Sequence, residues 1–247
     1  MNSFFSPTAN CLVRWHDLPG TGAPVIFIHG LGCASSYEYP RVVTDPNFGG
    51  RRAILIDLPG CGYSHKPQNY SYSTSDQARV VAELVKHLGI QCYLYGHSMG
   101  GSISIEAAAM LEDCLLGLIV SEPNFHPGGG FFSKKICSYS EDKFIDSRWQ
   151  QMVEQDSTPW SGSLALDAPW AVWRGAASLI SGNNWMALFI KSPLKKQLLF
   201  GEYSLPDDDF AYLQTSGLST VILPACGHCM SWENPGALAR ALSEFCR

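Results

Sequence analysis

The chain has 247 residues, of which 46% are hydrophobic and 16% charged, and its formal net charge is −5. This length and composition are those of an ordinary globular protein with one large domain or two small ones. Lysine and arginine are scattered, with no basic run to neutralise phosphates and no basic amphipathic helix. This pattern argues against nucleic-acid and membrane partners.

The N-terminal segment Met1–Phe5 has neither the charged region nor the long apolar region of a secretory signal. No apolar stretch approaches the roughly 20 residues that span a bilayer. Nine cysteines are scattered from Cys11 to Cys246. In a chain without an export signal we expect reduced, mostly buried thiols, and we predict a cytoplasmic protein.

Short, continuously apolar runs recur along the chain and predict strands that are covered on both faces, as in a parallel sheet. They are Val25–Ile28, Ile54–Ile56, Tyr93–Tyr95, Leu118–Val120, Leu198–Phe200 and Val221–Leu223. Amphipathic patterns predict helices over 73–88, after Ser98, and from an N-cap at Asn234 with Pro235 at the first helical position. Strands that alternate with helices predict a doubly wound α/β fold.

The stretch from Pro123 to about Lys196 interrupts this alternation, because it contains no clear strand. Five tryptophans fall in it: Trp149, Trp160, Trp170, Trp173 and Trp185. We predict a largely helical insertion that forms a lid over the functional site, rather than a peripheral helical layer. The glycines Gly128–Gly130 are either a hinge for this lid or a plain flexible loop.

The segment from Cys92 to Gly101 has the pattern of a strand, then the motif Gly96-His97-Ser98-Met99-Gly100 followed by a second glycine, then a helix. A serine on a sharp strand-to-helix turn presents its hydroxyl above the sheet, and the flanking glycines make room for the backbone. The helix that begins at Met99 points its N–H groups and positive dipole end toward a developing oxyanion. The pattern predicts Ser98 as a nucleophile.

Four motifs resemble the α/β-hydrolase superfamily in type, order and spacing. They are His29-Gly30 after an apolar strand, Asp57–Ser64, Gly96–Gly101, and Gly227-His228 ahead of Glu233-Asn234-Pro235. The resemblance implies an α/β-hydrolase fold, with an eight-stranded, mostly parallel sheet flanked by helices and a helical cap inserted after strand 6. Residues 1–122 and 197–247 would then form the core, and residues 123–196 the cap.

The resemblance also implies site residues. The backbone N–H groups of Leu31 and Met99 correspond to the oxyanion hole, and His228, just after the last strand, corresponds to the general base. His97 belongs to the strand-to-helix turn and His29 to the oxyanion loop. We interpret Asp57–Gly62 as a structural turn, because its proline and glycines shape the backbone.

The segment Cys226-Gly227-His228-Cys229 also matches the C-x-x-C motif of disulfide-exchange proteins. That motif needs its first cysteine at a helix N-terminus, where the dipole lowers the thiol pKa, whereas we expect the next helix only near Asn234. A zinc site would need two further ligands at suitable spacing, and none is evident. We interpret the motif as a coincidence and predict no metal and no organic cofactor.

The acid that orients the histidine departs from the commoner family pattern. Most members place an aspartate after the seventh strand, in a pattern like G-x-x-D, but here the stretch is Gly201-Glu202-Tyr203-Ser204. Glu122 follows the sixth strand, and Pro123 would end that strand and leave the carboxylate at the edge of the sheet where ligands bind. We predict Glu122 as the acid, with Asp207 and Asp208 as alternatives.

These residues predict a serine hydrolase that uses a Ser98–His228–Glu122 triad and an acyl-enzyme to cleave a carboxylic ester or thioester. We expect a small, largely apolar acyl substrate. The same fold hosts C–C bond hydrolases, lyases and perhydrolases, and Ser204 leaves open a ligand receptor without turnover. The sequence gives no oligomeric state. The predicted substrate-binding residues are Trp149, Trp170, Trp173 and Trp185, with Phe131, Phe132 and Phe189 adding apolar surface.

Overall fold

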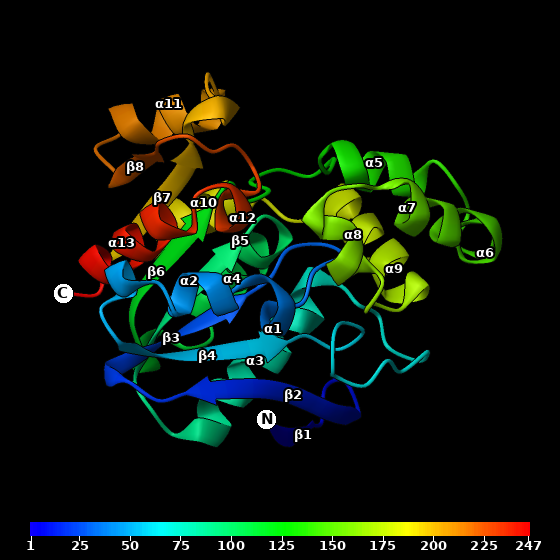
Figure 1. The fold of residues 1–247 in the computed structure, drawn as a ribbon, viewed down its shortest axis with the longest axis horizontal. Coiled ribbons are helices and arrows are strands. Elements are labelled where there is room, and N and C mark those ends of the chain that lie inside the picture. The colour runs from blue at the N-terminus through cyan, green and yellow to red at the C-terminus, as the bar shows by residue number, and fades with distance from the viewer.

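The computed structural model describes the backbone of residues 1–247 and every side chain except that of Glu112. An eight-stranded sheet lies at its centre, in the spatial order β1-β2-β4-β3-β5-β6-β7-β8 (Figure 1). β2 is antiparallel to both of its neighbours and every other neighbouring pair is parallel, which confirms the predicted mostly parallel sheet. The strands are β1 (Asn2–Ser6), β2 (Cys11–Leu18), β3 (Thr21–Ile28), β4 (Arg51–Asp57), β5 (Cys92–His97), β6 (Leu115–Ser121), β7 (Lys196–Gly201) and β8 (Thr220–Leu223).

Helices cover both faces of the sheet and bury two apolar clusters against it. One face is covered by α3 (Thr74–Leu88), α4 (Met99–Ala108), α10 (Trp185–Lys191) and α11 (Asp208–Thr215). The other is covered by α2 (Pro40–Val43), α12 (Met230–Glu233) and α13 (Pro235–Phe245), and α1 (Ser35–Glu38) directly precedes α2.

The helix ends follow local side-chain chemistry. The side chain of Ser73 accepts a hydrogen bond from the N–H of Asp76 at the start of α3, and Gly89 ends this helix in the left-handed conformation. Asn234 caps α13 by accepting from the N–H of Ala237, 3.1 Å away. Both predicted helix starts are therefore confirmed.

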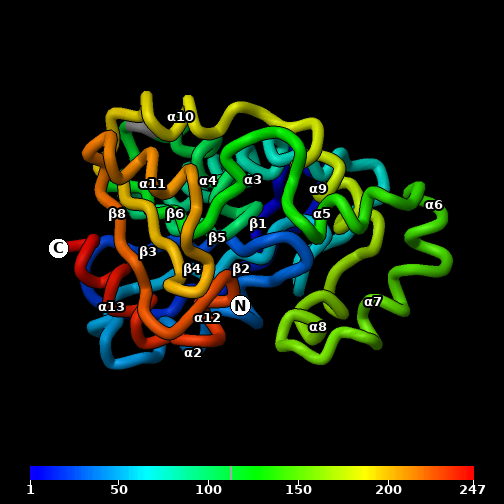
Figure 2. The backbone as a smooth tube through the Cα atoms, turned by 90° about the horizontal axis from the view of Figure 1, so that it is seen from above, coloured from blue at the N-terminus to red at the C-terminus, as the bar shows by residue number. Residues whose placement is uncertain are grey.

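The segment between β6 and β7 contains α5 (Phe131–Cys137), α6 (Glu141–Lys143), α7 (Trp149–Gln155), α8 (Pro159–Leu164), α9 (Pro169–Ser181) and α10, and none of its described residues forms a strand. Helices α5 to α8 lie to one side of the sheet in both views (Figures 1 and 2). This group has an apolar cluster of its own around Ile136, Phe144 and Leu164. By contrast, α10 packs against α4, where the indole N–H of Trp185 donates to Glu106 over 2.7 Å.

Two expectations drawn from composition also meet the structure. All the cysteines carry free thiols, and most of them are buried. Among the described residues, no helix combines the length and the apolar character needed to cross a membrane.

Candidate active site

Ser98 lies on the sharp turn between β5 and α4, with φ +53° and ψ −122°. A positive φ is strained in a residue with a side chain, at a cost on the order of 1–3 kcal/mol. The glycines around it are required by close packing: a Cβ on Gly96 would lie 2.2 Å from the carbonyl oxygen of Gly100, and one on Gly100 would lie 2.3 Å from that of Ile28. The motif therefore holds β3, β5 and α4 together closely enough to force the turn.

Glu122 directly follows β6 and contacts His228, which follows β8. Its Oε2 lies 2.7 Å from Nδ1 of His228, and its Oε1 accepts a 2.9 Å hydrogen bond from the N–H of Gly201. Burial raises the pKa of Glu122, but the hydrogen bond and charge of His228, the Gly201 N–H and the Ser204 hydroxyl together lower it below its usual value. Glu122 is thus a carboxylate near neutral pH and holds the imidazole proton on Nδ1, leaving Nε2 free to act as a base.

The alternative acids lie elsewhere in the structure. The carboxylate of Asp207 accepts from the N–H of Phe210, 2.8 Å away, and so caps α11, while Asp208 is the first residue of that helix. Ser204 stands at the position where an aspartate is commoner, and its hydroxyl is one of the groups that lower the pKa of Glu122. The geometry favours Glu122 as the partner of His228.

Ser98, Glu122 and His228 line one cavity of about 440 Å³. Among the described side chains, no hydrogen bond joins the Ser98 hydroxyl to His228, and such contacts are often loose before a substrate binds. The ring of His97 lies 4.6 Å from that of His228, and its Nδ1 lies 2.9 Å from the hydroxyl of Ser121. Burial and the neighbouring His228 lower the pKa of His97 to about 3, so this ring is a neutral spacer beside the base.

The predicted oxyanion loop lies against the serine turn, since a Cβ on Gly30 would come within 3.4 Å of the Ser98 Cβ. His29 fixes this loop: its Nε2 accepts from the N–H of Leu58 over 3.1 Å, so its Nδ1 carries the proton toward the carbonyl of Gly30, 3.0 Å away. Leu31 lines the cavity, and its carbonyl oxygen accepts a 3.0 Å hydrogen bond from the indole of Trp160. Leu31 and Ser98 therefore line the same cavity, and the oxyanion-hole role of the Leu31 and Met99 N–H groups stays a prediction.

Comparison with known proteins identifies the fold that carries this site. The family model described as alpha/beta hydrolase fold matches residues 23–136. The structure is similar to an esterase of Thermogutta terrifontis, with a TM-score of 0.80 and 22% identity over 98% of this chain and 96% of the other. It is also similar to an esterase of Exiguobacterium antarcticum, with a TM-score of 0.79 and 18% identity over 100% of this chain and 99% of the other. The chain has the α/β-hydrolase fold.

Sequence relatives of this chain match it over a shorter stretch. Haloalkane dehalogenase 2 of Mycobacterium tuberculosis is 34% identical over 110 residues, which are 44% of this chain and 37% of the dehalogenase. A dihydrolipoyllysine-residue acetyltransferase component from Pseudomonas putida is 34% identical over 104 residues, 40% of this chain and 26% of that protein. The match thus spans little more than a third of these relatives' length at most.

The expectation that Trp149, Trp170, Trp173 and Trp185 bind substrate requires a correction, because none of them lines the cavity. Trp185 is fully buried against α4, and the indole of Trp173 donates to the carbonyl of Tyr139. Trp149 packs on Phe144 within the insertion, and Trp170 packs against the main core. Trp149 and Trp173 thus pack in the insertion's own core, and Trp170 and Trp185 in the main core. The aromatic residues that do line the cavity are Trp160, Trp232, Phe131 and Phe132, whereas the expected Phe189 is buried in the core.

The C-x-x-C segment also differs from expectation in one respect. A helix begins at Met230, not near Asn234, and Cys229 is its N-cap. Burial is the main factor that raises the pKa of both Cys226 and Cys229 to about 11, the opposite of what a reactive redox thiol needs. The thiol chemistry therefore gives no support to disulfide exchange.

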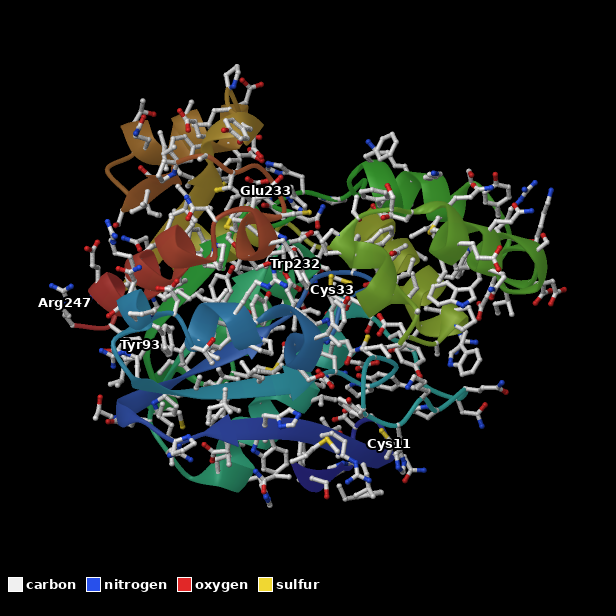
Figure 3. The ribbon with its side chains drawn as sticks, in the orientation of Figure 1. Cys11, Cys33, Tyr93, Trp232, Glu233 and Arg247 are labelled. Carbon is white, nitrogen blue, oxygen red and sulfur yellow. The ribbon has the colours of Figure 1, made fainter. Side chains whose placement is uncertain are left out.

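Sequence reasoning missed several residues of the cavity wall. Glu38, on the four-residue helix α1, lines the cavity although it is only 3% exposed, and Cys33 and Trp232 lie near it. Figure 3 shows Cys33 and Trp232 at the junction between the sheet domain and the inserted helices. No sequence signal distinguishes Glu38 from a surface carboxylate, because its burial depends on contacts from the far end of the chain.

Proposed function

We propose that this chain is a serine hydrolase that cleaves an ester or thioester of a small, largely apolar substrate through an acyl-enzyme on Ser98. The observation that carries the proposal is the 2.7 Å contact between Glu122 and His228 at the wall of the cavity that also holds the strained Ser98. A buried carboxylate, an imidazole with a free nitrogen and a serine on a sharp turn are the parts that acyl transfer needs.

In the proposed reaction, the Ser98 hydroxyl attacks the substrate carbonyl while Nε2 of His228 takes its proton. The N–H groups of Leu31 and Met99 hold the negative oxygen of the tetrahedral intermediate. Glu122 stabilises the imidazolium, which then gives its proton to the leaving group. Water, activated by His228, attacks the acyl-enzyme and releases the acid.

We further propose that residues 123–196 form a cap over this site, with α5 and α8 at its mouth. Phe131 and Phe132 of α5 and Trp160 of α8 line the cavity, and the bond from Trp160 to the carbonyl of Leu31 links the cap to the oxyanion loop. Movement of α8 would therefore shift the loop whose N–H group is proposed to hold the oxyanion. Apolar walls of this kind favour an acyl chain over a charged group.

The similar esterase structures support ester hydrolysis as the first reaction to test. A fluorophosphonate probe and p-nitrophenyl esters would be given to the wild type and to Ser98→Ala. Ser102→Ala is a matched control, because Ser102 lies in the first turns of α4, close to Ser98 in sequence, and its hydroxyl donates to the carbonyl of Asn124.

We expect Ser98→Ala to lose labelling and at least about 10³-fold in kcat, while Ser102→Ala keeps both. Labelling that persists in Ser98→Ala would overturn the assignment of the nucleophile. A wild type that neither labels nor cleaves any ester would favour a C–C bond hydrolase, a lyase or a ligand receptor instead.

A further inference from the structure

The charged side chains of the cavity are all acidic. Glu38, Glu122 and Asp156 line it, and no lysine or arginine appears among its described lining residues. Glu122 is bound to His228, and Asp156 accepts from the N–H and hydroxyl of Thr158. The proposed reaction uses neither Glu38 nor Asp156, and Glu38 is the buried one of the two. The absence of lysine and arginine among these lining residues makes the cavity unfavourable for anionic substrate groups.

Glu38 is held in place but is not fully hydrogen-bonded. Its Oε1 accepts a 2.7 Å hydrogen bond from the hydroxyl of Ser231, whereas its Oε2 is buried without a partner among the described residues. Burial raises the pKa of Glu38, and Ser231, the thiol of Cys33 and the charge of His228 lower it in part. A buried acceptor without a donor costs about 1–3 kcal/mol, so such a group is well suited to a donor that arrives with a ligand.

The neighbours of Glu38 indicate which part of the substrate it faces. Its partner Ser231 lies on α12, immediately after the loop that carries His228, and the charge of His228 acts on its carboxyl group. In acyl transfer the histidine gives its proton to the leaving oxygen, so the alcohol portion of an ester must lie beside His228. Phe131, Phe132 and Trp160 supply apolar wall from the inserted helices, which suits the acyl portion.

We propose that Glu38 is a specificity-determining residue that accepts a hydrogen bond from the alcohol portion of the substrate. The substrate class is then an ester of an alcohol that carries a second, uncharged donor, a hydroxyl or an amide N–H, as in a monoester of a diol or polyol. This inference rests on the proposed ester hydrolysis. An ester without that donor leaves Oε2 unpaired, and sites built around such a bond reject the analogue that lacks it.

The first test uses the wild type and three butyrate esters that differ only in the alcohol: hydroxyethyl, methoxyethyl and ethyl butyrate. Acid release is followed by titration. We expect kcat/KM for the hydroxyethyl ester to exceed that for each of the other two by about tenfold, the effect of one hydrogen bond of about 1.4 kcal/mol. The methoxyethyl ester separates a donor from mere polarity, because its oxygen can only accept.

Variants then assign the preference to Glu38. Glu38→Met keeps the length of the side chain without its oxygens and should reduce the hydroxyethyl-to-ethyl ratio to about one. In Glu38→Gln the Ser231 hydroxyl, unlike a backbone N–H, can turn to accept from the new NH₂ group, so the amide oxygen stays available to the substrate and most of the ratio should be retained. Asp156→Asn is the matched control, since it removes a different acidic group from the same cavity wall and should leave the ratio as in the wild type.

The outcomes separate this inference from the proposed function. Equal kcat/KM values for the three esters in an active wild type would overturn the role of Glu38 and leave ester hydrolysis intact. A hydroxyethyl preference that Glu38→Met keeps, or that Asp156→Asn abolishes, would also overturn it. If Glu38→Met does not fold, Glu38→Ala removes the same oxygens and takes its place in the test. Failure to cleave any ester would instead refute the proposed function.

Discussion

Replacing Glu122 with glutamine perturbs the proposed triad while preserving its shape. The carboxylate accepts two hydrogen bonds, from the N–H of Gly201 and from Nδ1 of His228. Glutamine has one acceptor oxygen and one amide NH₂, so in either orientation a donor meets a donor. If the oxygen stays on Gly201, the NH₂ group faces Nδ1, and the ring must carry its proton on Nε2, where it can no longer act as a base.

The magnitude follows from this choice of tautomer. Loss of the carboxylate in a serine–histidine–acid triad lowers kcat by about 10⁴-fold when the acid is fully buried, or about 5.5 kcal/mol in the barrier. Here the His228 side chain is 50% exposed, although that of Glu122 is only 8% exposed, so water replaces part of the lost interaction. We expect a loss of about 10³-fold in kcat for Glu122→Gln.

The assay is steady-state hydrolysis of p-nitrophenyl butyrate, with Asp207→Asn as the control. Asparagine is as good an N-cap as aspartate, so α11 should stay intact and kcat/KM should change by less than about twofold. Glu122→Gln activity within about tenfold of the wild type would refute the reasoning. A large loss in Asp207→Asn would refute it too, and would make Asp207 the acid.

Three further predictions concern the rest of the site. Gly96→Ala should lower the free energy of unfolding, measured in urea, by about 3 kcal/mol or more, because the new Cβ would lie 2.2 Å from backbone. Gly89→Ala is the control: Gly89 has φ +61° and open space around it, so the loss should be about 1 kcal/mol. Equal losses in the two variants would contradict the steric account. Trp160→Ala should raise KM for p-nitrophenyl octanoate by about tenfold, while Trp173→Ala, which is outside the cavity wall, should not. The pKa of His97 is lowered from 6.5 to about 3, so the unfolded chain binds a proton there that the folded chain does not. The free energy of unfolding should therefore fall as the pH drops from 6.5 to 3, by up to about 1.4 kcal/mol per pH unit. In His97→Gln it should fall less steeply. An unchanged slope in that variant would exclude His97 as the cause.

The central sheet was predictable because its strands are buried on both faces and give continuous apolar runs. β2 was not found in this way, because it buries alternate residues, Cys11, Val13 and Trp15, as a strand near the sheet edge does. Glu122 was also predictable as a candidate, since Pro123 marks the end of β6. Its contact with His228 depends on the sheet order, which the family resemblance implied and local sequence patterns do not encode.

The cavity wall was harder to predict than the proposed triad. A tryptophan in an amphipathic helix carries the same local pattern whether it faces the core of the insertion, as Trp173 does, or a cavity, as Trp160 does. Trp232 follows the last strand and so lies outside the insertion, where the run of tryptophans predicts the substrate contacts. Glu38 becomes recognisable only when α12 covers it from the other end of the chain.

The placement of the acid after β6 has a consequence for building fusion proteins from this chain. No proposed triad member comes from α11 or β8, and the turn between them is exposed, with open space around Gly217. In Figure 1, α11 lies at the edge of the molecule, on the opposite side from the inserted helices. A peptide inserted at this turn would extend into solvent. The turn between α11 and β8 is therefore a suitable place to attach a reporter or to create new chain termini.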